Sequence, residues 1–121
     1  MVMGIGTPRV GEARDPQGLV VTISQSAWEH ITGDEGHPEM RGRLEDVLQA
    51  IRTPTLIQAS ASDPEGSRIY YRLKATASGR YANLYTVVVV KVDEDLATGQ
   101  VRTAYLTASP GKGRLLWMAK K

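Results

Sequence analysis

The apolar residues of this chain follow first a short β pattern, then a helical spacing, then several β patterns. In the longer of two predicted helices, apolar residues recur at spacings of four, three, one and three: Met40, Leu44, Val47, Leu48 and Ile51. A shorter helix is predicted just before it, because Ser26 and Glu29 have the spacing of a capping box. Gly33 and Gly36 end the first helix, and Pro54 ends the second.

Strand patterns lie on both sides of these helices. Residues 19–23 are a short β-branched run, residues 55–58 are extended, and residues 84–92 hold four consecutive valines, as in a central strand covered on both faces. Residues 101–107 form a last strand. Residues 67–74 alternate, which predicts a buried face and a solvent-exposed face; the first holds Ile69, Tyr71 and Leu73, and the second holds Arg68, Tyr70, Arg72 and Lys74. This order predicts an α+β fold with helices packed on one face of a sheet.

Length and composition limit the domain organisation. The chain has 121 residues, of which 41% are hydrophobic, enough for one modest core. Glycines and prolines are crowded near the start, so residues 1–18 are expected to be a flexible leader or linker and residues 19–121 a single domain. With 15 Lys or Arg against 13 Asp or Glu, the net charge of +2 permits contact with an anionic polymer without implying it.

Composition also excludes several classes of function. The chain has no cysteine, which excludes disulfides, a thiolate nucleophile and cysteine-ligated zinc. We find no apolar run of the kind that a signal peptide or a membrane span needs, so a cytoplasmic location without a membrane partner is expected. Any chemistry must rest on histidines, carboxylates, hydroxyls and cations.

The candidate chemistry is carried by the two histidines and the last predicted strand. His30 and His37 lie seven residues apart, and histidine titrates nearest neutral pH. Thr103, Tyr105 and Thr107 alternate along one face of that strand. RNA cleavage through its own 2′-hydroxyl needs a base, an acid for the leaving 5′-oxygen, and a cation or donor for the phosphate. The candidates for RNA binding are Arg68, Tyr70, Arg72, Thr107 and Lys112.

Each of these residues also has a structural interpretation. His30 is placed to pack against Trp28 or to cap a carbonyl at a helix C-terminus, and His37 stands where an N-cap would. Threonine and tyrosine suit any half-buried strand. The cationic face of residues 67–74 is by default a solvated surface.

Other constellations fit less well. Gly111-Lys112-Gly113 lacks the glycine spacing and the hydroxyl residue of a P-loop, and no Gly-x-Ser-x-Gly elbow of a serine hydrolase occurs. A metal site made from His30, Asp34, Glu35 and His37 is disfavoured, because two glycines break the helix that would align its ligands. No cofactor is therefore expected.

Several short motifs together resemble a nuclease superfamily. They are Trp28-Glu29-His30-Ile31, His37-Pro38-Glu39, Leu48 through Ile51 to Pro54 and Ile57, Asn83-Leu84-Tyr85-Thr86-Val87-Val88, and Thr103-Ala104-Tyr105. From about Val20 to Thr107 the chain is similar to phage-associated members of the superfamily that groups barnase, EndoU, colicin and RelE nucleases, and it resembles BrnT-type toxins almost as well. The family pattern places its histidines closer together than here.

The resemblance implies a RelE/barnase-like fold, in which two N-terminal helices pack on a roughly four-stranded antiparallel sheet. It further implies that His30, His37, Thr103 and Tyr105 share one catalytic cleft. The sequence thus predicts a toxin-type, metal-independent endoribonuclease that cleaves single-stranded RNA by general acid–base catalysis, with an antitoxin or immunity protein as a candidate second partner.

Two alternatives stay open. The first is a catalytically inactive RNA- or protein-binding module on the same fold, as in a phage or mobile-element accessory protein. The second is a phage structural or packaging accessory. The oligomeric state is also open, because an exposed edge strand such as residues 67–74 would allow pairing with a second copy or an inhibitor.

Overall fold

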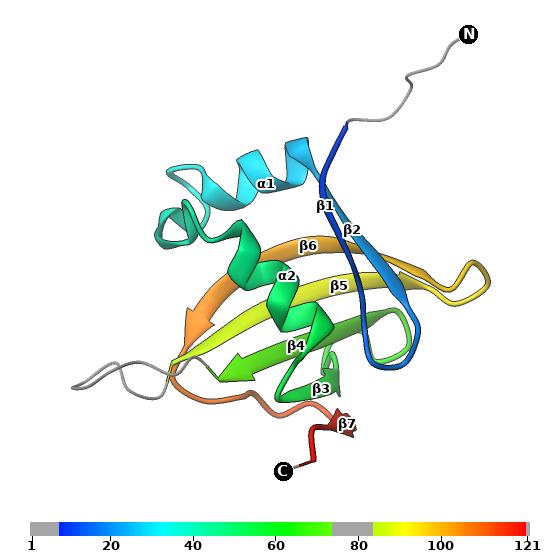
Figure 1. Ribbon diagram of the computed structural model, residues 1–121. Coiled ribbons are helices and arrows are strands. Elements are labelled where there is room, and N and C mark those ends of the chain that lie inside the picture. Colours follow the sequence, from blue (N-terminus) through cyan, green and yellow to red (C-terminus); the bar gives the residue numbers. More distant parts are fainter. Residues whose placement is uncertain (1–7, 74–83, 121) are drawn as a thin grey trace, which may run out of the picture.

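One seven-stranded mixed sheet forms the body of the computed structural model, which describes residues 8–73 and 84–120. The elements follow in the order β1 (Arg9–Arg14), β2 (Val20–Ser24), α1 (Gln25–Thr32), the 3-10 turn η1 (Pro38–Met40), α2 (Leu44–Arg52), β3 (Leu56–Ala59), β4 (Ser67–Leu73), β5 (Tyr85–Asp93), β6 (Thr98–Thr107) and β7 (Leu115–Met118). In space the strands are ordered β1-β2-β6-β5-β4-β3-β7 (Figure 1). Of the neighbouring strand pairs in the described chain, only β2 and β6 run parallel to each other.

The predicted sheet of roughly four antiparallel strands after two N-terminal helices is wrong. Two strands, β1 and β2, precede the helices, and β2 extends the sheet by pairing with β6. At the other edge the C-terminal tail adds β7, which pairs with β3. The sheet is therefore larger, mixed and built from both ends of the chain.

Strand β1 and the turn of the β1–β2 hairpin lie within the segment that was expected to be a leader or linker, and β2 corresponds to the predicted run of residues 19–23. The turn is Asp15-Pro16-Gln17-Gly18, in which Gly18 has a φ of +93° that favours glycine. Oδ1 of Asp15 accepts hydrogen bonds from the N–H groups of Gln17 (2.9 Å) and Leu19 (2.8 Å). Because β1 pairs with β2 and buries Ala13, residues 9–18 belong to the folded unit. Residues 1–7 of the expected leader, Lys74 and Asn83 lie outside the described residues.

The two predicted helices exist and end where expected, α1 before Gly33 and α2 before Pro54, but both begin at other residues than predicted. Ser24 rather than Ser26 is the N-cap of α1, since its Oγ accepts the N–H of Ala27 at 3.1 Å. Met40 belongs to η1, so α2 begins only at Leu44. Neither helix of the described chain is long and apolar enough to cross a membrane.

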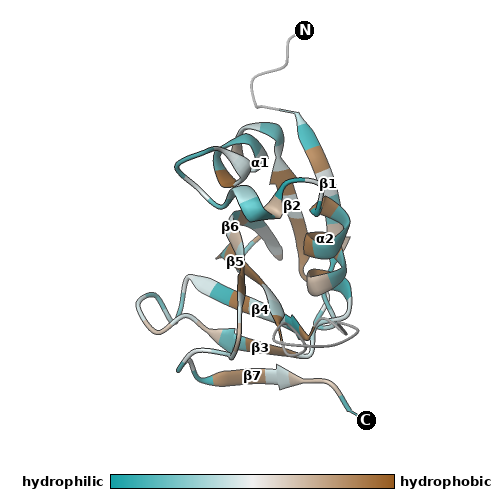
Figure 2. Ribbon diagram, turned by 90° about the vertical axis from the view of Figure 1, so that its left-hand side faces the viewer, coloured by the Kyte–Doolittle hydropathy of each residue, from teal (hydrophilic) through white to brown (hydrophobic). Residues whose placement is uncertain are grey.

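The core lies between α2 and the side of the sheet that we call the inner face. Val47, Ala50 and Ile51 of α2 are fully buried there, against Val88 and Ala104 of the sheet. Figure 2 shows α2 beside the β1–β2 hairpin. The predicted central strand is confirmed, because β5 is the middle strand and buries residues on both faces.

Strand β4 lacks the solvent-exposed face that was predicted. Tyr71, predicted to be buried, is buried with 3% exposure, but a residue of the predicted exposed face is buried as well. Tyr70, expected on the solvent-exposed face, has no exposed surface and belongs to the core. Its hydroxyl donates to Oδ2 of Asp15 at 2.6 Å, and Nη1 of Arg68 lies 3.5 Å from the same oxygen. Because a residue of the hairpin turn accepts its hydrogen bond, the buried hydroxyl of Tyr70 is not left without a partner. Strand β4 is also not an edge strand, because it lies between β3 and β5.

The other side of the sheet, the outer face, carries a row of cross-strand neighbours. Leu56, Tyr71, Val87 and Tyr105 are successive register partners across β3, β4, β5 and β6. Residues 108–114, which we call the strap, cross this face on the way to β7. The strap is fastened where the Gly111 N–H donates to the Tyr71 hydroxyl (3.0 Å) and Gln58 Nε2 donates to the Gly111 carbonyl (3.0 Å).

Candidate functional site

His37 and Tyr105, both predicted to be catalytic, touch each other beside the outer face. Their ring centroids are 5.3 Å apart, with the planes inclined by 30°. Nδ1 of His37 lies 3.4 Å from Oε2 of Glu39, and these two side chains are 40% and 44% exposed. His37 precedes η1 but makes no side-chain capping bond. Among the described residues, the second nitrogen, Nε2, has no hydrogen-bond partner.

The loop between α1 and η1 brings the two histidine backbones together. The His37 N–H donates to the Ile31 carbonyl at 2.6 Å. A Cβ atom on Gly36 would lie 2.4 Å from the His30 carbonyl oxygen, so only glycine permits this approach. The loop between the histidines therefore folds back on the end of α1.

His30 lines a groove of about 720 Å³ between α1, β2 and β6. The polar residues that share it with His30 are Arg9, Thr22, Ser24, Ser26, Gln100 and Arg102. Arg9 is paired with Glu12 at 2.8 Å. Among the described residues, neither the His30 imidazole nor the Arg102 guanidinium has a hydrogen-bond or ion-pair partner. An unpaired base and an unpaired cation thus face the same groove.

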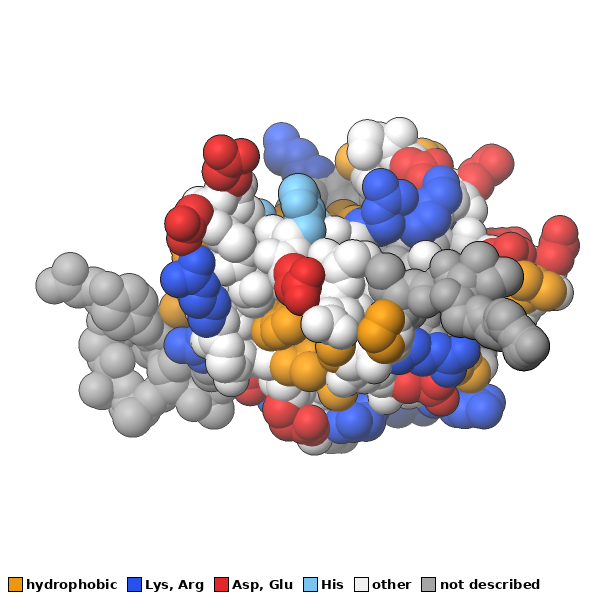
Figure 3. Space-filling model, turned by 90° about the horizontal axis from the view of Figure 1, so that it is seen from above, with side chains coloured by type: hydrophobic (Ala, Val, Ile, Leu, Met, Phe, Trp, Pro, Cys, Tyr) orange, Lys and Arg blue, Asp and Glu red, His pale blue; other side chains and the backbone are white. Residues whose placement is uncertain are grey.

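Strand β6 connects this groove to the His37 contact. Arg102 occupies a β-bulge opposite Val89 and Val90, and Thr103 and Tyr105 follow it on the outer face. Thr107 continues that face, and its Oγ1 donates to the Ser109 carbonyl at 3.2 Å. We call the groove, this part of β6 and His37 the β6 site. Figure 3, which looks down on α1, shows histidine at the surface with Lys and Arg side chains to both sides.

The electrostatics of the β6 site favour a protonated Tyr105. Burial, followed by the nearby Tyr71 phenol, raises the pKa of Tyr105 above its ordinary value. Its hydroxyl therefore remains a hydrogen-bond donor at neutral pH. Lys112 is exposed on the strap that is anchored to Tyr71.

Three predicted RNA-binding residues lie elsewhere. Tyr70 is fully buried, so it has no surface on which a base can stack. Arg68 pairs with Asp15, and Arg72 follows Tyr70 on the inner face, half-buried. The structure therefore brings together His37 and Tyr105 and places Thr103 and Thr107 on the same strand face as Tyr105. It separates this group from Arg68, Tyr70 and Arg72 of β4.

Sequence reasoning missed Arg102, Gln100 and the orienting carboxylate of Glu39. Strand alternation alone would turn Arg102 towards the core, and only the bulge releases it. A signal was present in the charges, because the chain after Asp95 has five Lys or Arg and no Asp or Glu.

Two further features do not extend the β6 site. An adjoining groove of about 810 Å³ shares Gln100 and Arg102, but acidic Glu65, Asp93 and Glu94 line it together with basic residues, so it does not select an anion. Within the described residues, no three His, Asp or Glu side chains are grouped to hold a metal ion.

Comparison with known proteins found no matching family model, no matching curated protein and no matching solved structure.

Proposed function

We propose that this protein is an endoribonuclease that cleaves single-stranded RNA at the β6 site by general acid–base catalysis, with no need for a metal ion. The observation that carries this proposal is that both histidines face β6, His30 beside Arg102 and His37 on Tyr105. One strand thus meets two imidazoles, several hydroxyls and a cation that has no partner within the described chain.

The chemistry assigns a role to each group. One imidazole takes the proton of the 2′-hydroxyl, the 2′-oxygen attacks phosphorus, and the bond from phosphorus to the 5′-oxygen breaks. The other imidazole gives a proton to that leaving oxygen. The products are a 2′,3′-cyclic phosphate and a 5′-hydroxyl. Arg102 neutralises the charge on the crowded phosphate, and Glu39 orients His37 from Nδ1 so that Nε2 is reactive.

Tyr105 and Lys112 complete the site. A phenol ring on the sheet face suits stacking of a base, and the protonated hydroxyl is a donor for phosphate or sugar. Lys112 on the strap adds a second cation.

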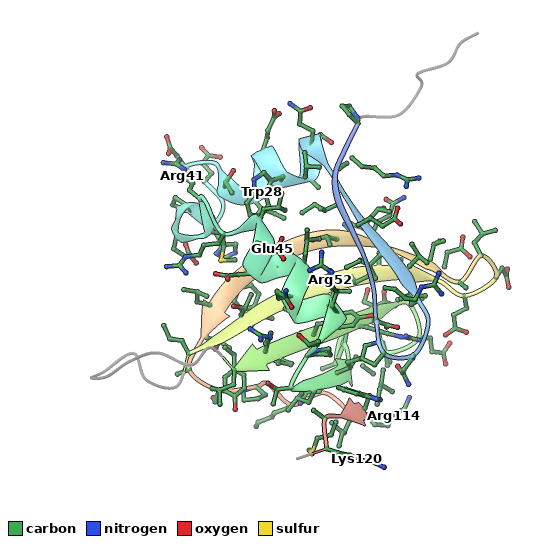
Figure 4. All side chains as sticks on the ribbon, viewed as in Figure 1. Trp28, Arg41, Glu45, Arg52, Arg114 and Lys120 are labelled. Atoms are coloured by element: carbon green, nitrogen blue, oxygen red, sulfur yellow. The ribbon has the colours of Figure 1, made fainter. Side chains whose placement is uncertain are left out.

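The test is incubation of RNA with the protein in excess EDTA. We expect fragments with 2′,3′-cyclic phosphate and 5′-hydroxyl ends, and His30→Gln and His37→Gln should each slow cleavage by about 100-fold. Arg102→Gln should also reduce cleavage. Arg52→Gln is the matched control, because Arg52 lies on α2 and is held by Glu45 at 3.0 Å (Figure 4). Cleavage that survives both histidine substitutions in folded protein would disprove the proposal.

A second function, RNA binding without cleavage, is favoured by the aromatic residues of the outer face. The Tyr71 and Tyr85 rings meet edge to face at 6.3 Å, and Tyr105 lies in the same row as Tyr71. Tyr85 and Tyr105 are half-buried and can stack bases whether or not the histidines react, whereas Tyr71, only 3% exposed, supports their rings from below. Intact RNA together with binding that weakens steeply with salt would support this function instead.

A further inference from the structure

The two edge strands of the sheet, as far as the described residues show it, are β1 and β7. Within the described residues β7 pairs with β3 alone, so its other side has no strand partner. The Ala119 N–H is turned towards β3, where it donates to the Thr55 carbonyl at 2.9 Å. Because backbone groups alternate along a strand, Met118 presents its N–H and carbonyl to the open side.

Strand β7 exposes large apolar side chains next to this open backbone. Leu115 is 49% exposed and Met118 is 56% exposed, and both face outwards as register partners of Gln58 and Leu56. Leu116 and Trp117 pack against the core and fix the strand. The strand is therefore held in place by its buried residues, while its exposed apolar side chains would be stabilised by contact with a partner.

Cations flank β7 along the chain. Lys112, Arg114 and Lys120 lie before and after it, and no acidic residue follows Asp95. Arg114 also lines the groove of about 810 Å³ that holds Glu65, Asp93 and Glu94, whereas Lys112 and Lys120 do not line it. Figure 4 shows Arg114 and Lys120 beside β7. The β1 edge differs, because Arg9 there is already paired with Glu12.

We propose that β7 is the docking edge for an extended acidic segment of a partner protein, which adds to the sheet as an eighth strand. Main-chain groups of the segment would pair with β7, its apolar residues would cover Leu115 and Met118, and its carboxylates would meet Arg114 and Lys120. A second copy fits less well, because antiparallel pairing of two β7 strands brings Arg114 of each close to Lys120 of the other. RNA lacks the peptide N–H and carbonyl groups that are needed to pair with a strand. This inference does not depend on the proposed nuclease activity.

The experiment uses the whole chain and three synthetic decapeptides. The first has two glutamates at each end and alternating valine and threonine between them. The second replaces the glutamates by lysines, and the third carries N-methyl groups on alternate residues of the acidic peptide. Binding is followed by amide NMR shifts and by hydrogen exchange at Met118, and self-association is checked by sedimentation.

We expect the acidic peptide to bind roughly tenfold more tightly than the lysine peptide, and to protect the Met118 amide. The double variant Arg114→Glu/Lys120→Glu should reverse this preference while keeping the free protein's spectrum. N-methylation should abolish binding. The proposal is overturned if both charged peptides bind equally or neither binds up to about 1 mM. It is also overturned if N-methylation has no effect, if the shifts lie away from β7, or if RNA or a second copy protects Met118 instead.

Discussion

Two clusters on opposite faces of the sheet contain the same residue types, tyrosine, arginine and carboxylate, but differ in whether these side chains bind one another. On the inner face, Asp15, Arg68 and Tyr70 satisfy one another, and the Asp15 side chain has no exposed surface. At the β6 site, Tyr105 and Arg102 are accessible and Arg102 has no partner within the described chain. The difference shows that residue type alone does not mark a site. A candidate site is marked instead by donors and acceptors that bind no other protein group, because these groups can bind a ligand.

The substitution expected to have the largest effect is Asp15→Ala, which removes the carboxylate of the inner-face cluster. The substitution leaves the Tyr70 hydroxyl buried without its acceptor and removes two hydrogen bonds from the hairpin turn. We expect the free energy of unfolding to fall by about 3 kcal/mol, measured by urea denaturation. Glu12→Ala, an exposed carboxylate on the same hairpin, is the control and should change it by less than about 0.5 kcal/mol. A small effect of Asp15→Ala would show that the inner cluster is not structural.

Gly36→Ala tests whether the loop positions the histidines. The added methyl collides with the carbonyl oxygens of His30 and Ile31, so the loop must shift and carry His37 with it. We expect a loss of stability of about 2 kcal/mol and at least tenfold slower RNA cleavage. Gly42→Ala is the matched control, since Gly42 has a φ of +76° but open space around it. Equal loss of cleavage in both variants would contradict the positioning role.

The two tyrosines should respond differently to the loss of a hydroxyl. Tyr70→Phe should lower the free energy of unfolding by about 1.5 kcal/mol, because the Asp15 carboxylate loses a charged hydrogen bond. Tyr105→Phe should change it by less than about 0.5 kcal/mol while weakening RNA binding or cleavage. Equal effects on stability would remove the distinction between the faces.

Alkaline pH gives the smallest and most specific test. Burial first, and then the hydrogen bond to Asp15, raise the pKa of Tyr70 well above its ordinary value. An unfolded tyrosine ionises near pH 10 while folded Tyr70 stays protonated, so stability is complete below about pH 10 and falls above it. Tyr70→Phe should show a shallower fall than the parent protein between about pH 9.5 and 11. Parallel curves would contradict the burial of this phenol.

Local patterns in the sequence correctly predicted the elements whose own apolar residues are enough to place them in the core. The four valines of β5 and the apolar stripe of α2 suffice to place both in the core. Strand β1 carries glycine and charged residues and buries only Ala13, so its pattern resembles a linker. Its turn, Asp15-Pro16-Gln17-Gly18, was the available signal for a hairpin.

The candidate site was predicted in part. The alternation of Thr103, Tyr105 and Thr107 was readable, and His37 does meet Tyr105. The inner position of Tyr70 was not readable, because neighbouring Tyr70 and Tyr71 suit either face and the choice depends on Asp15, 55 positions away. The exposure of Arg102 depends likewise on a bulge that no local pattern encodes.

The parallel pairing of β2 with β6 determines how late in synthesis and folding the sheet can be completed. Val20 meets Thr98, so the hairpin made first must wait for nearly the last strand before it can join the sheet. Such a high contact order predicts slow folding and, on the ribosome, a long period in which the hairpin and helices have no sheet to cover. The β6 site is assembled across that same junction. A nascent chain therefore has no β6 site until β6 has been synthesised and paired.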